Sequence, residues 1–369
     1  PFVGAFADSM PKGRVMFISN TIKITGCGLL FFAMHQYHAL AAYAVVGLGA
    51  AAYSPAKYGI LTELLPSEKL VIANGWIEGL TVASIVLGTV FGGVLITPAV
   101  ANVLMGFDFP FIDTGIDSAL EVSILLVAII YAIAALFNLY IPNTGVDHRI
   151  PKKNPFYLIH EFRHCVKLLW TDKLGQISLA VTTLFWGAGA TLQFIVLKWA
   201  EVAMNYPLNQ AAQLQGVVAV CIAIGAIMAA RWVSLRQSVK VIPLGIAMGI
   251  VVMAMILVKD LWIAIALLML IGGLAGFFVV PMNALLQHRG HILMGAGHSI
   301  AVQNFNENLS ILLMLSLYAA LILLDVHIYV VIVAFGLFVS VMMALIRKWH
   351  LLNQSKEDSL HLIGENKKH

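Results

Sequence analysis

The sequence predicts an all-α polytopic membrane protein, and three observations support that prediction. Apolar residues make up 60% of the chain and charged residues only 11%, against about 45–50% and about 25% in soluble domains. The mean hydropathy is +0.91. The apolar residues also gather in continuous runs of about 20, which is the length that crosses a bilayer as a helix.

We predict about ten membrane-spanning helices. The runs are continuously apolar rather than alternating, and this excludes a membrane β-barrel. The expected spans are 15–34, 39–61, 70–96, 119–141, 175–197, 211–230, 241–258, 261–286, 297–324 and 327–346.

The basic residues are distributed unevenly between the two sides of the predicted spans. The chain has 22 Lys and Arg residues, of which Lys23 and Lys57 fall inside spans. Only Lys198 and Lys259 lie in loops on one side, and all the others lie on the opposite side. Cytoplasmic loops carry the excess of Lys and Arg, so the opposite side is predicted to be cytoplasmic.

The spans fall into two bundles separated by a polar segment. This segment contains several prolines and an amphipathic stretch, NPFYLIHEFRHCVKLLW, which we expect to form a helix on the anionic cytoplasmic leaflet. The expected domains are an N-terminal bundle of about four spans at 1–141, a cytoplasmic linker at 142–174, a C-terminal bundle of six spans at 175–349 and a cytoplasmic tail at 350–369.

The two bundles share an internal repeat. GLGAAAYSP ends at Pro55 and GLAGFFVVP ends at Pro281, and each is followed by a charged turn and then an apolar span that contains Glu78 or Glu307. This order predicts a parallel duplication. Three spans lie between the linker and the helix of Pro281, but only one full span precedes the helix of Pro55. We therefore expect two N-terminal spans to be missing and the intact protein to have twelve.

The opening segment GAFADSMPKGR resembles the signature of the major facilitator superfamily for the loop between its second and third helices, G-x-x-x-D-R-x-G-R-R. Ser9 stands where the signature has its first Arg. An aspartate in this position can cap the N-terminus of a helix. The resemblance implies a facilitator fold of two helical bundles. It also implies a conformational-switch loop made of Gly4, Asp8, Lys12, Gly13 and Arg14.

Four further segments resemble the lysophospholipid transporter family of the Gram-negative inner membrane, namely residues 47–79, 184–194, 279–290 and 295–308. The resemblance extends from Pro1 to about residue 348. It implies a transporter rather than an enzyme, without a cofactor, that moves lysophosphatidylethanolamine or lysophosphatidylglycerol from the outer to the inner leaflet by alternating access. It also implies functional coupling to a cytoplasmic acyltransferase–acyl-carrier-protein synthetase, which reacylates these lipids.

A lysolipid carrier needs a polar pocket for the charged head and a lateral path for the acyl chain. Each ionisable residue inside a span costs roughly 2.5–3.5 kcal/mol on insertion, so such residues usually have a partner or a function. A cation suits the phosphate and a carboxylate suits an ethanolamine ammonium. Structural pairing, snorkelling of Lys57 and association of helices through amides remain alternative roles. The expected substrate-binding or gating residues are Glu78, Glu307, Lys57, Lys23, Gln193, Gln303, Asn304 and Asn308.

Two other functions can be written for this sequence. One is an ion-coupled facilitator for a small amphiphile, with Glu78 or Glu307 carrying the proton. The other is an intramembrane metalloprotease, since His160 to His164 spells H-E-x-x-H. We expect no metal there, because the helix is basic and amphipathic and only Asp172 offers a third ligand. The sequence contains no nucleotide fingerprint, and we expect no nucleic-acid partner.

Overall fold

The computed structural model describes all residues except 33–35, 96, 106–117, 146–153, 357–362 and 364–369. The described residues form helices joined by turns, with no strand among them, and this confirms the predicted all-α class. The helices are α1 (Phe2–Asp8), α2 (Lys12–Phe31), α3 (Gln36–Leu64), η1 (Ser67–Lys69), α4 (Leu70–Leu95), α5 (Pro98–Met105), α6 (Ala119–Asn138), α7 (Pro155–Thr171), α8 (Gly175–Met204), α9 (Leu208–Trp232), η2 (Leu235–Val241), α10 (Ile242–Met253), η3 (Ala254–Leu257), α11 (Leu261–Met294), α12 (Ala296–Leu323) and α13 (Ile328–Lys356).

The chain forms two compact units. The first comprises Pro1–Leu64, Ser84–Glu161 and Ala296–Ile300, and the second comprises Leu65–Ala83, Phe162–Gly295 and Ala301–His369. The division passes through three helices. The first half of α4 and most of α12 belong to the second unit, whereas the second half of α4 and the first turn of α12 belong to the first.

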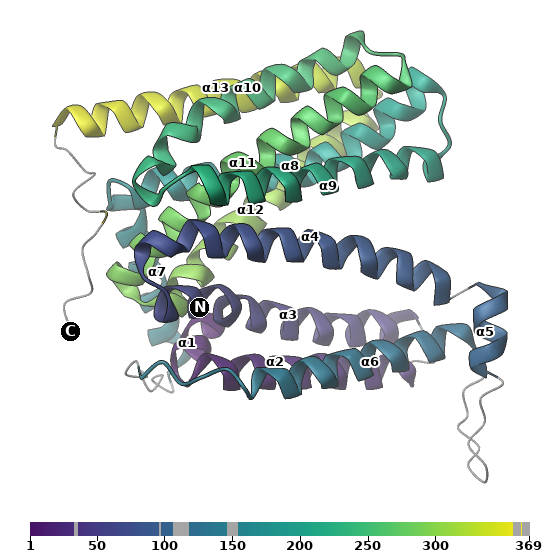
Figure 1. The fold of residues 1–369 in the computed structure, drawn as a ribbon, viewed down its shortest axis with the longest axis vertical. Coiled ribbons are helices and arrows are strands. Elements are labelled where there is room, and N and C mark those ends of the chain that lie inside the picture. Colours follow the sequence, from purple (N-terminus) through teal and green to yellow (C-terminus); the bar gives the residue numbers. More distant parts are fainter. Residues whose placement is uncertain (33–35, 96, 106–117, 146–153, 357–362, 364–369) are drawn as a thin grey trace. The chain divides into compact units, whose positions relative to one another are not determined.

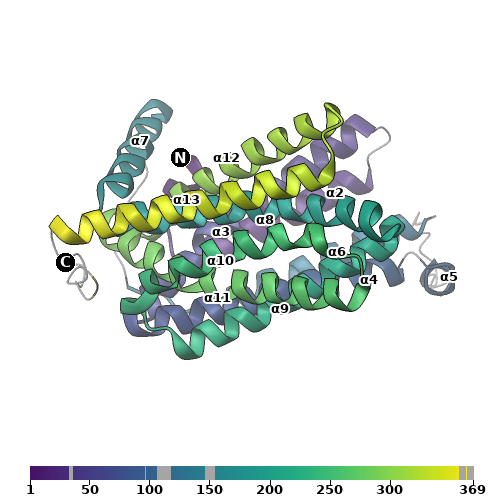
Figure 2. The ribbon, with the colours of Figure 1, turned by 90° about the horizontal axis from the view of Figure 1, so that it is seen from above.

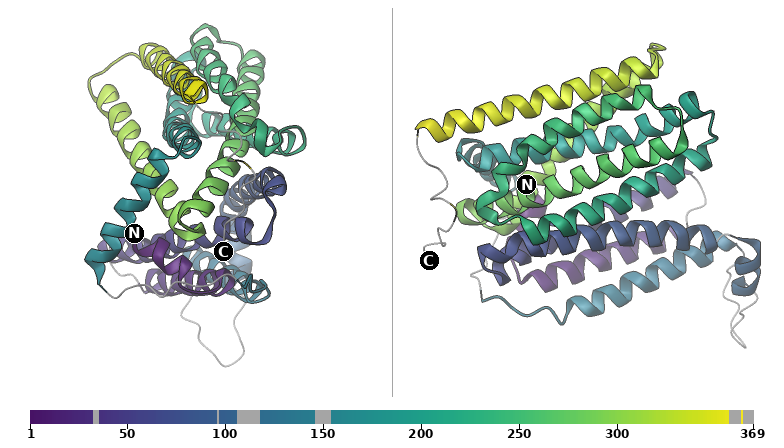
Figure 3. Two further views of the ribbon diagram at one scale, coloured as in Figure 1. Left: turned by 90° about the vertical axis from the view of Figure 1, so that its left-hand side faces the viewer. Right: turned by 45° about the horizontal axis from the view of Figure 1, so that its top comes forward.

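In the first unit, α2 packs against both α3 and α6, and the three helices run side by side (Figures 1 and 3). Small residues allow the close approach of α2 and α3. A Cβ atom on Gly49 would lie 2.8 Å from the carbonyl oxygen of Ser19, and one on Gly26 would lie 2.8 Å from the backbone nitrogen of Val46. Glycine at both positions therefore lets the two backbones come together, as is common between membrane helices.

In the second unit, α9 packs along α11, α10 packs along α13, and α8 contacts α9, α11 and α13 (Figures 1 and 2). Backbone proximity again depends on glycine, because a Cβ atom on Gly276 of α11 would collide with the carbonyl oxygen of Ile222 on α9. The indole nitrogen of Trp199, on α8, donates a hydrogen bond to the carbonyl oxygen of Met255 in η3 at 2.9 Å. The indole is buried, so this bond satisfies a donor that has no access to solvent.

Eight of the described helices are long and apolar enough to cross a membrane. The remaining two predicted spans, 15–34 and 70–96, correspond to α2 and α4, which are helical but are not among those eight. The polytopic membrane class is therefore confirmed, and the count of ten stays a prediction. The eight are Gln36–Leu64, Leu120–Asn138, Gly175–Met204, Gln210–Trp232, Leu235–Leu257, Leu261–Met294, Ala296–Leu323 and Ile328–Lys356.

Both repeat units identified in the sequence fold as a proline-containing helix followed by a second helix. Pro55 lies inside α3 and Pro281 lies inside α11, and both are buried. The helix that follows is α4 in one case and α12 in the other, and these carry Glu78 and Glu307 respectively. The two hairpins therefore have the same element order.

The amphipathic stretch of the linker forms α7. Its second half packs into an apolar cluster of the second unit, where Phe162, Cys165 and Leu169 contact residues of α8, α11 and α12. In its first half, Phe156 and Ile159 are exposed. Arg149, Lys152 and Lys153 lie outside the described residues, as do most of the tail 350–369 and Asp108, Asp113 and Asp117 of the loop 97–118.

Candidate functional site

A reciprocal pair of amides connects α4 to α11 within the second unit. The side-chain nitrogen of Asn74 donates to the Gln287 carbonyl oxygen at 2.9 Å, and the Gln287 nitrogen donates back to Asn74 at 2.9 Å. Asn74 also donates to the carbonyl oxygen of Leu70 at 2.9 Å. Both side chains are buried. A pair that exchanges two hydrogen bonds in an apolar interior fixes both helices in register.

A second set of polar contacts lies one helical turn away on α11. The Gln303 side-chain nitrogen, on α12, donates to Asn283 Oδ1 at 3.2 Å and to Glu307 Oε1 at 2.8 Å. The Thr182 hydroxyl, on α8, donates to the carbonyl oxygen of Leu179 at 3.2 Å and lies near the Glu307 carboxyl group. Gln303, Glu307, Asn283 and Thr182 are all buried. Two polar side chains, Gln303 and Thr182, therefore approach the Glu307 carboxyl group, and Gln303 also connects it to Asn283.

The two carboxyl groups singled out in the sequence both lie in this part of the second unit. Glu78 on α4 is close enough to Glu307 for their charges to interact, and both are buried, at 6% and 8% exposure. We call the resulting set the polar ladder. It consists of Asn74, Glu78, Asn283, Gln287, Gln303 and Glu307.

Helical periodicity explains why the ladder is continuous. Asn74 and Glu78, Asn283 and Gln287, and Gln303 and Glu307 are each four positions apart, so each pair occupies one face of its helix. The sequence analysis identified Glu78, Gln303 and Glu307 but missed Asn74, Asn283 and Gln287. The signal that could have found them is this recurrent spacing of polar residues inside apolar helices.

Close packing holds the α4 side of the ladder against α9. A Cβ atom on Gly75 would lie 2.6 Å from Ala230 Cβ and 2.9 Å from the carbonyl oxygen of Ala226. Neither neighbour is the flexible end of a side chain, so a larger residue would push the helices apart. Gly75 is adjacent to Asn74, so the same turn of α4 supplies a hydrogen-bonding group and a packing surface.

The predicted conformational-switch loop forms an ionic network in the first unit. Asp8 accepts hydrogen bonds from the backbone nitrogens of Gly297 and His298, at 2.7 and 3.0 Å, so it caps the N-terminus of α12. His298 Nδ1 lies 2.7 Å from Asp8 as well. Lys12 Nζ lies 2.8 Å from Asp8. Burial alone would raise the pKa of Asp8, but the hydrogen bonds from His298 and Lys12 and the Lys12 charge together hold it well below its usual value.

Lys12 is the centre of this network. Its ammonium group also lies 3.2 Å from Glu63 at the end of α3 and donates to the carbonyl oxygen of Ala7 at 2.7 Å. Thr144 donates to the other Glu63 oxygen at 2.9 Å. The remaining loop residues have different surroundings, since Gly4 and Gly13 are buried and Arg14 is exposed.

Lys23 is held by polar and aromatic groups inside the first unit. Its ammonium group lies 3.2 Å from Asn20 Oδ1 and 4.3 and 5.1 Å from the ring centroids of Tyr53 and Tyr131. Lys57 lies 4.9 Å from the ring centroid of Tyr58, its neighbour on α3. Cation–π contacts of this kind stabilise a buried ammonium without neutralising it.

The other predicted amides are peripheral to the ladder. Gln193 is exposed, and its backbone oxygen accepts a hydrogen bond from Gln215 at 2.6 Å. Asn308 is exposed and donates to the carbonyl oxygen of Asn304 at 2.7 Å. Gln193 lies on α8, and Asn304 and Asn308 lie on α12.

The H-E-x-x-H histidines lie on α7, and both His160 and His164 are exposed. Asp172, the third ligand considered from the sequence, instead forms a buried ion pair with Arg289, with Oδ2 2.7 Å from Nη2 and Oδ1 3.1 Å from Nε. Its Oδ1 also accepts from the backbone nitrogen of Gly175 at 2.7 Å. Asp172 therefore joins the start of α8 to the end of α11.

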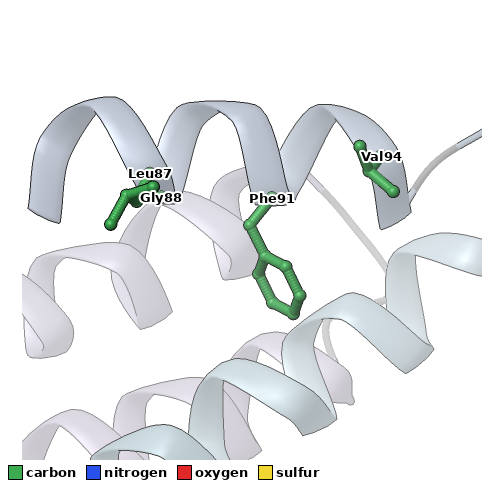
Figure 4. Close-up of a pocket in the computed structure, with 4 residues that line it drawn as sticks. All are labelled: Leu87, Gly88, Phe91 and Val94. Atoms are coloured by element: carbon green, nitrogen blue, oxygen red, sulfur yellow. The ribbon is translucent and has the colours of Figure 1, made fainter.

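The second half of α4, in the first unit, borders an apolar recess of about 460 Å³ lined by Leu87, Gly88, Phe91 and Val94. Figure 4 shows these residues along α4, with the ring of Phe91 extending away from the helix. All four are apolar, so the recess can hold hydrocarbon but offers no hydrogen bond.

Residues 1–314 match the Major Facilitator Superfamily. The lysophospholipid transporter LplT of Serratia proteamaculans (strain 568) is 44% identical over 320 residues, covering 86% of this chain and 75% of that protein. LplT of Klebsiella pneumoniae (strain 342) is 40% identical over 356 residues, covering 95% of this chain and 82% of that protein.

Solved structures support the same fold. The E. coli fucose:proton symporter FucP superimposes with a TM-score of 0.72 at 12% identity, covering 95% of this chain and 86% of that one. The human organic anion transporter MFSD10 gives a TM-score of 0.68 at 13% identity, covering 98% and 79%. These similarities concern the fold alone. Together with the sequence matches, they show that the chain belongs to the Major Facilitator Superfamily and, within it, to the lysophospholipid transporter family.

Proposed function

We propose that this chain transports lysophospholipids across the bacterial inner membrane, moving lysophosphatidylethanolamine and lysophosphatidylglycerol from the outer to the inner leaflet. The observation that carries the proposal is the polar ladder, which places two carboxyl groups and four amides inside helices that are otherwise apolar. Buried ionisable groups in membrane helices are costly and usually mark a substrate or ion pathway. The names of the relatives support the class of substrate.

The ladder suits alternating access because its helices come from both repeats. Asn74 and Glu78 belong to the helix that follows Pro55, whereas Gln303 and Glu307 belong to the helix that follows Pro281. We propose an N-terminal bundle at 1–141, a linker at 142–174 and a C-terminal bundle at 175–349. Rocking of the bundles would then make and break the contacts of α4 with α11, and the Asn74–Gln287 pair would close one side of the pathway.

The apolar recess on α4 supports a lipid rather than a small polar solute as the substrate. Leu87, Phe91 and Val94 provide the kind of surface that one acyl chain requires, since burial of each methylene is worth about 0.8 kcal/mol relative to water. We further propose that the product is reacylated by a cytoplasmic acyltransferase–acyl-carrier-protein synthetase. In that case the chain itself performs transport and no catalysis.

We propose that the switch loop acts as a latch. Asp8 joins α12 to Lys12, and Lys12 joins Asp8 to Glu63, so one ammonium group connects three segments of the first unit. Lys23 and Lys57 are proposed to attract the lipid phosphate, and Gln193, Asn304 and Asn308 to border the pathway.

A second candidate function is proton-coupled transport of a small amphiphile. The interaction of Glu78 with Glu307 favours it, because two neighbouring buried carboxyl groups are stabilised when they share one proton.

One experiment separates the two functions. The chain is reconstituted in liposomes, labelled lysophosphatidylethanolamine is added to one leaflet, and the rate of its transfer is measured with and without a proton gradient. Lysolipid transport predicts transfer faster than in protein-free liposomes. A proton-coupled carrier that accepts the lysolipid predicts a transfer rate that rises when the gradient is imposed and falls again when an uncoupler is added. A carrier of other amphiphiles predicts no transfer above that of protein-free liposomes.

A further inference from the structure

We propose that Gln303, Glu307 and Glu78 form a binding site for a primary ammonium group, which in a lysophospholipid is the amine of the ethanolamine head. This inference rests on the proposed function and extends it, because it assigns one part of one headgroup to particular side chains.

The first observation is an acceptor without a donor. Gln303 uses its side-chain nitrogen for its hydrogen bonds to Asn283 and Glu307, whereas its oxygen Oε1 is buried and has no hydrogen-bond partner among the described residues. Gln303 is only 6% exposed. An acceptor left unsatisfied in an apolar interior destabilises the protein, and a ligand that donates a hydrogen bond would remove that cost.

The second observation is the excess of acceptors around it. Gln303 donates to Glu307 Oε1, so the orphaned oxygen belongs to the same side-chain amide that holds the carboxylate. Glu78 lies one helical turn from Asn74 on the same face of α4, and Asn74 is hydrogen-bonded to Gln287, one turn from Asn283 on α11, so the charge of Glu78 acts on Glu307. The two carboxyl groups and the amide oxygen together offer several hydrogen-bond acceptors, and an ionised carboxyl adds negative charge. Their complement is a cation with several N–H donors.

A primary ammonium group meets this requirement better than the other parts of a lysolipid. It carries one positive charge and three N–H donors, as the lysine ammonium does. The phosphate is an anion and would be repelled by the two carboxylates, and the glycerol hydroxyls of a lysophosphatidylglycerol head carry no positive charge. The site therefore distinguishes lysolipids by headgroup, and we infer that it favours ethanolamine over glycerol.

The test compares two lysolipids in one preparation. Proteoliposomes of the wild-type chain, of Glu307→Gln and of Gln303→Leu receive labelled lysophosphatidylethanolamine or lysophosphatidylglycerol at concentrations below saturation, and initial transfer rates are measured. We expect both variants to lower the ratio of ethanolamine to glycerol transport about tenfold, since a hydrogen bond to a charged group is worth about that factor. Thermal unfolding of each purified protein, compared with the wild type, shows whether the variants are folded.

The matched control is Glu201→Gln. It makes the same chemical change at an exposed glutamate on α8, paired with Lys198 at 3.0 Å, and it should leave the ratio unchanged. The ammonium site would be overturned if Glu307→Gln lowered the transfer rates of both lysolipids equally, or if both ladder variants kept the wild-type ratio of the two rates. Neither result would contradict lysolipid transport by the wild-type chain. If the wild-type chain moves neither lysolipid, the proposed function itself fails. A ratio that stays constant while both rates lose their pH dependence would identify the carboxyl pair as a proton site instead.

Discussion

The Asn74–Gln287 pair makes a prediction whose size follows from its geometry. Asn74→Leu and Gln287→Met each replace an amide with an apolar side chain of similar size, and each leaves the opposite amide buried without its partner. A buried polar group that loses its partner costs about 1–3 kcal/mol. The double variant removes both amides, so much of that cost should disappear. The two changes are therefore expected to be strongly non-additive.

The expected coupling energy can be bounded. Double-mutant cycles on hydrogen bonds between membrane helices average about 0.6 kcal/mol and reach about 1.7 kcal/mol. This pair exchanges two bonds of 2.9 Å between side chains that are 0% and 2% exposed. We therefore expect a coupling energy near the upper end, about 1–1.7 kcal/mol.

The measurement is the free energy of unfolding of the purified protein in mixed micelles, with a denaturing detergent as the titrant. The control is Asn306→Ala, whose side chain donates, among the described residues, to the carbonyl oxygen of Val302 on its own helix at 2.8 Å. It should unfold within about 0.5 kcal/mol of the wild type. If the losses from Asn74→Leu and Gln287→Met simply add in the double variant, the two amides are not energetically coupled and the gate assigned to them is wrong.

Three further predictions concern other parts of the chain. Asp8→Asn should destabilise the protein at neutral pH. The pKa of Asp8 lies below its ordinary value of about 3.9, so the difference in stability between the wild type and the variant should be largest above that pH. It should shrink as the pH falls further and Asp8 of the wild type becomes protonated, which thermal melts of both proteins at a series of pH values would measure. Gly276→Ala should lower the thermal unfolding temperature, since its Cβ would meet the Ile222 carbonyl. Gly273→Ala on the same helix, where a Cβ meets nothing within 4 Å, should leave it unchanged. Equal effects would reject the packing argument. Arg289→Met should lower the free energy of unfolding by about 3–5 kcal/mol in a denaturant titration, because it leaves the buried Asp172 carboxylate without its guanidinium partner. A decrease below about 1 kcal/mol would show that the pair contributes little to stability.

The fold class was accessible from the sequence because it depends on composition and periodicity. Continuous apolar runs indicate helices of membrane length, and the described helices lie near the predicted ranges. The internal repeat was readable as well, since Pro55 and Pro281 mark equivalent helices. The loop 106–117 and the basic residues at 146–153 lie outside the described residues.

The site was only partly accessible, because a sequence does not reveal which faces meet. Glu78 and Glu307 were selected for the cost of burying a charge, and the structure brings them together. Asn74 and Gln287 escaped notice because single amides in apolar helices usually have local roles, and only the folded chain shows that these two bind each other. Lys23 was expected among the substrate-binding or gating residues, with structural pairing as the alternative. In the first unit its ammonium group contacts two tyrosine rings, and an aromatic partner has no fixed spacing in the sequence.

The carboxyl groups of the polar ladder are proposed to bind the lipid head during transport. The direct measurement is the rate of lysophosphatidylethanolamine transfer between leaflets by reconstituted Glu78→Ala and Glu307→Ala variants, with protein amount and folding matched to the wild type. The ladder predicts that each variant transfers the lipid at least about tenfold more slowly than the wild type. Transfer at the wild-type rate by both variants would contradict it.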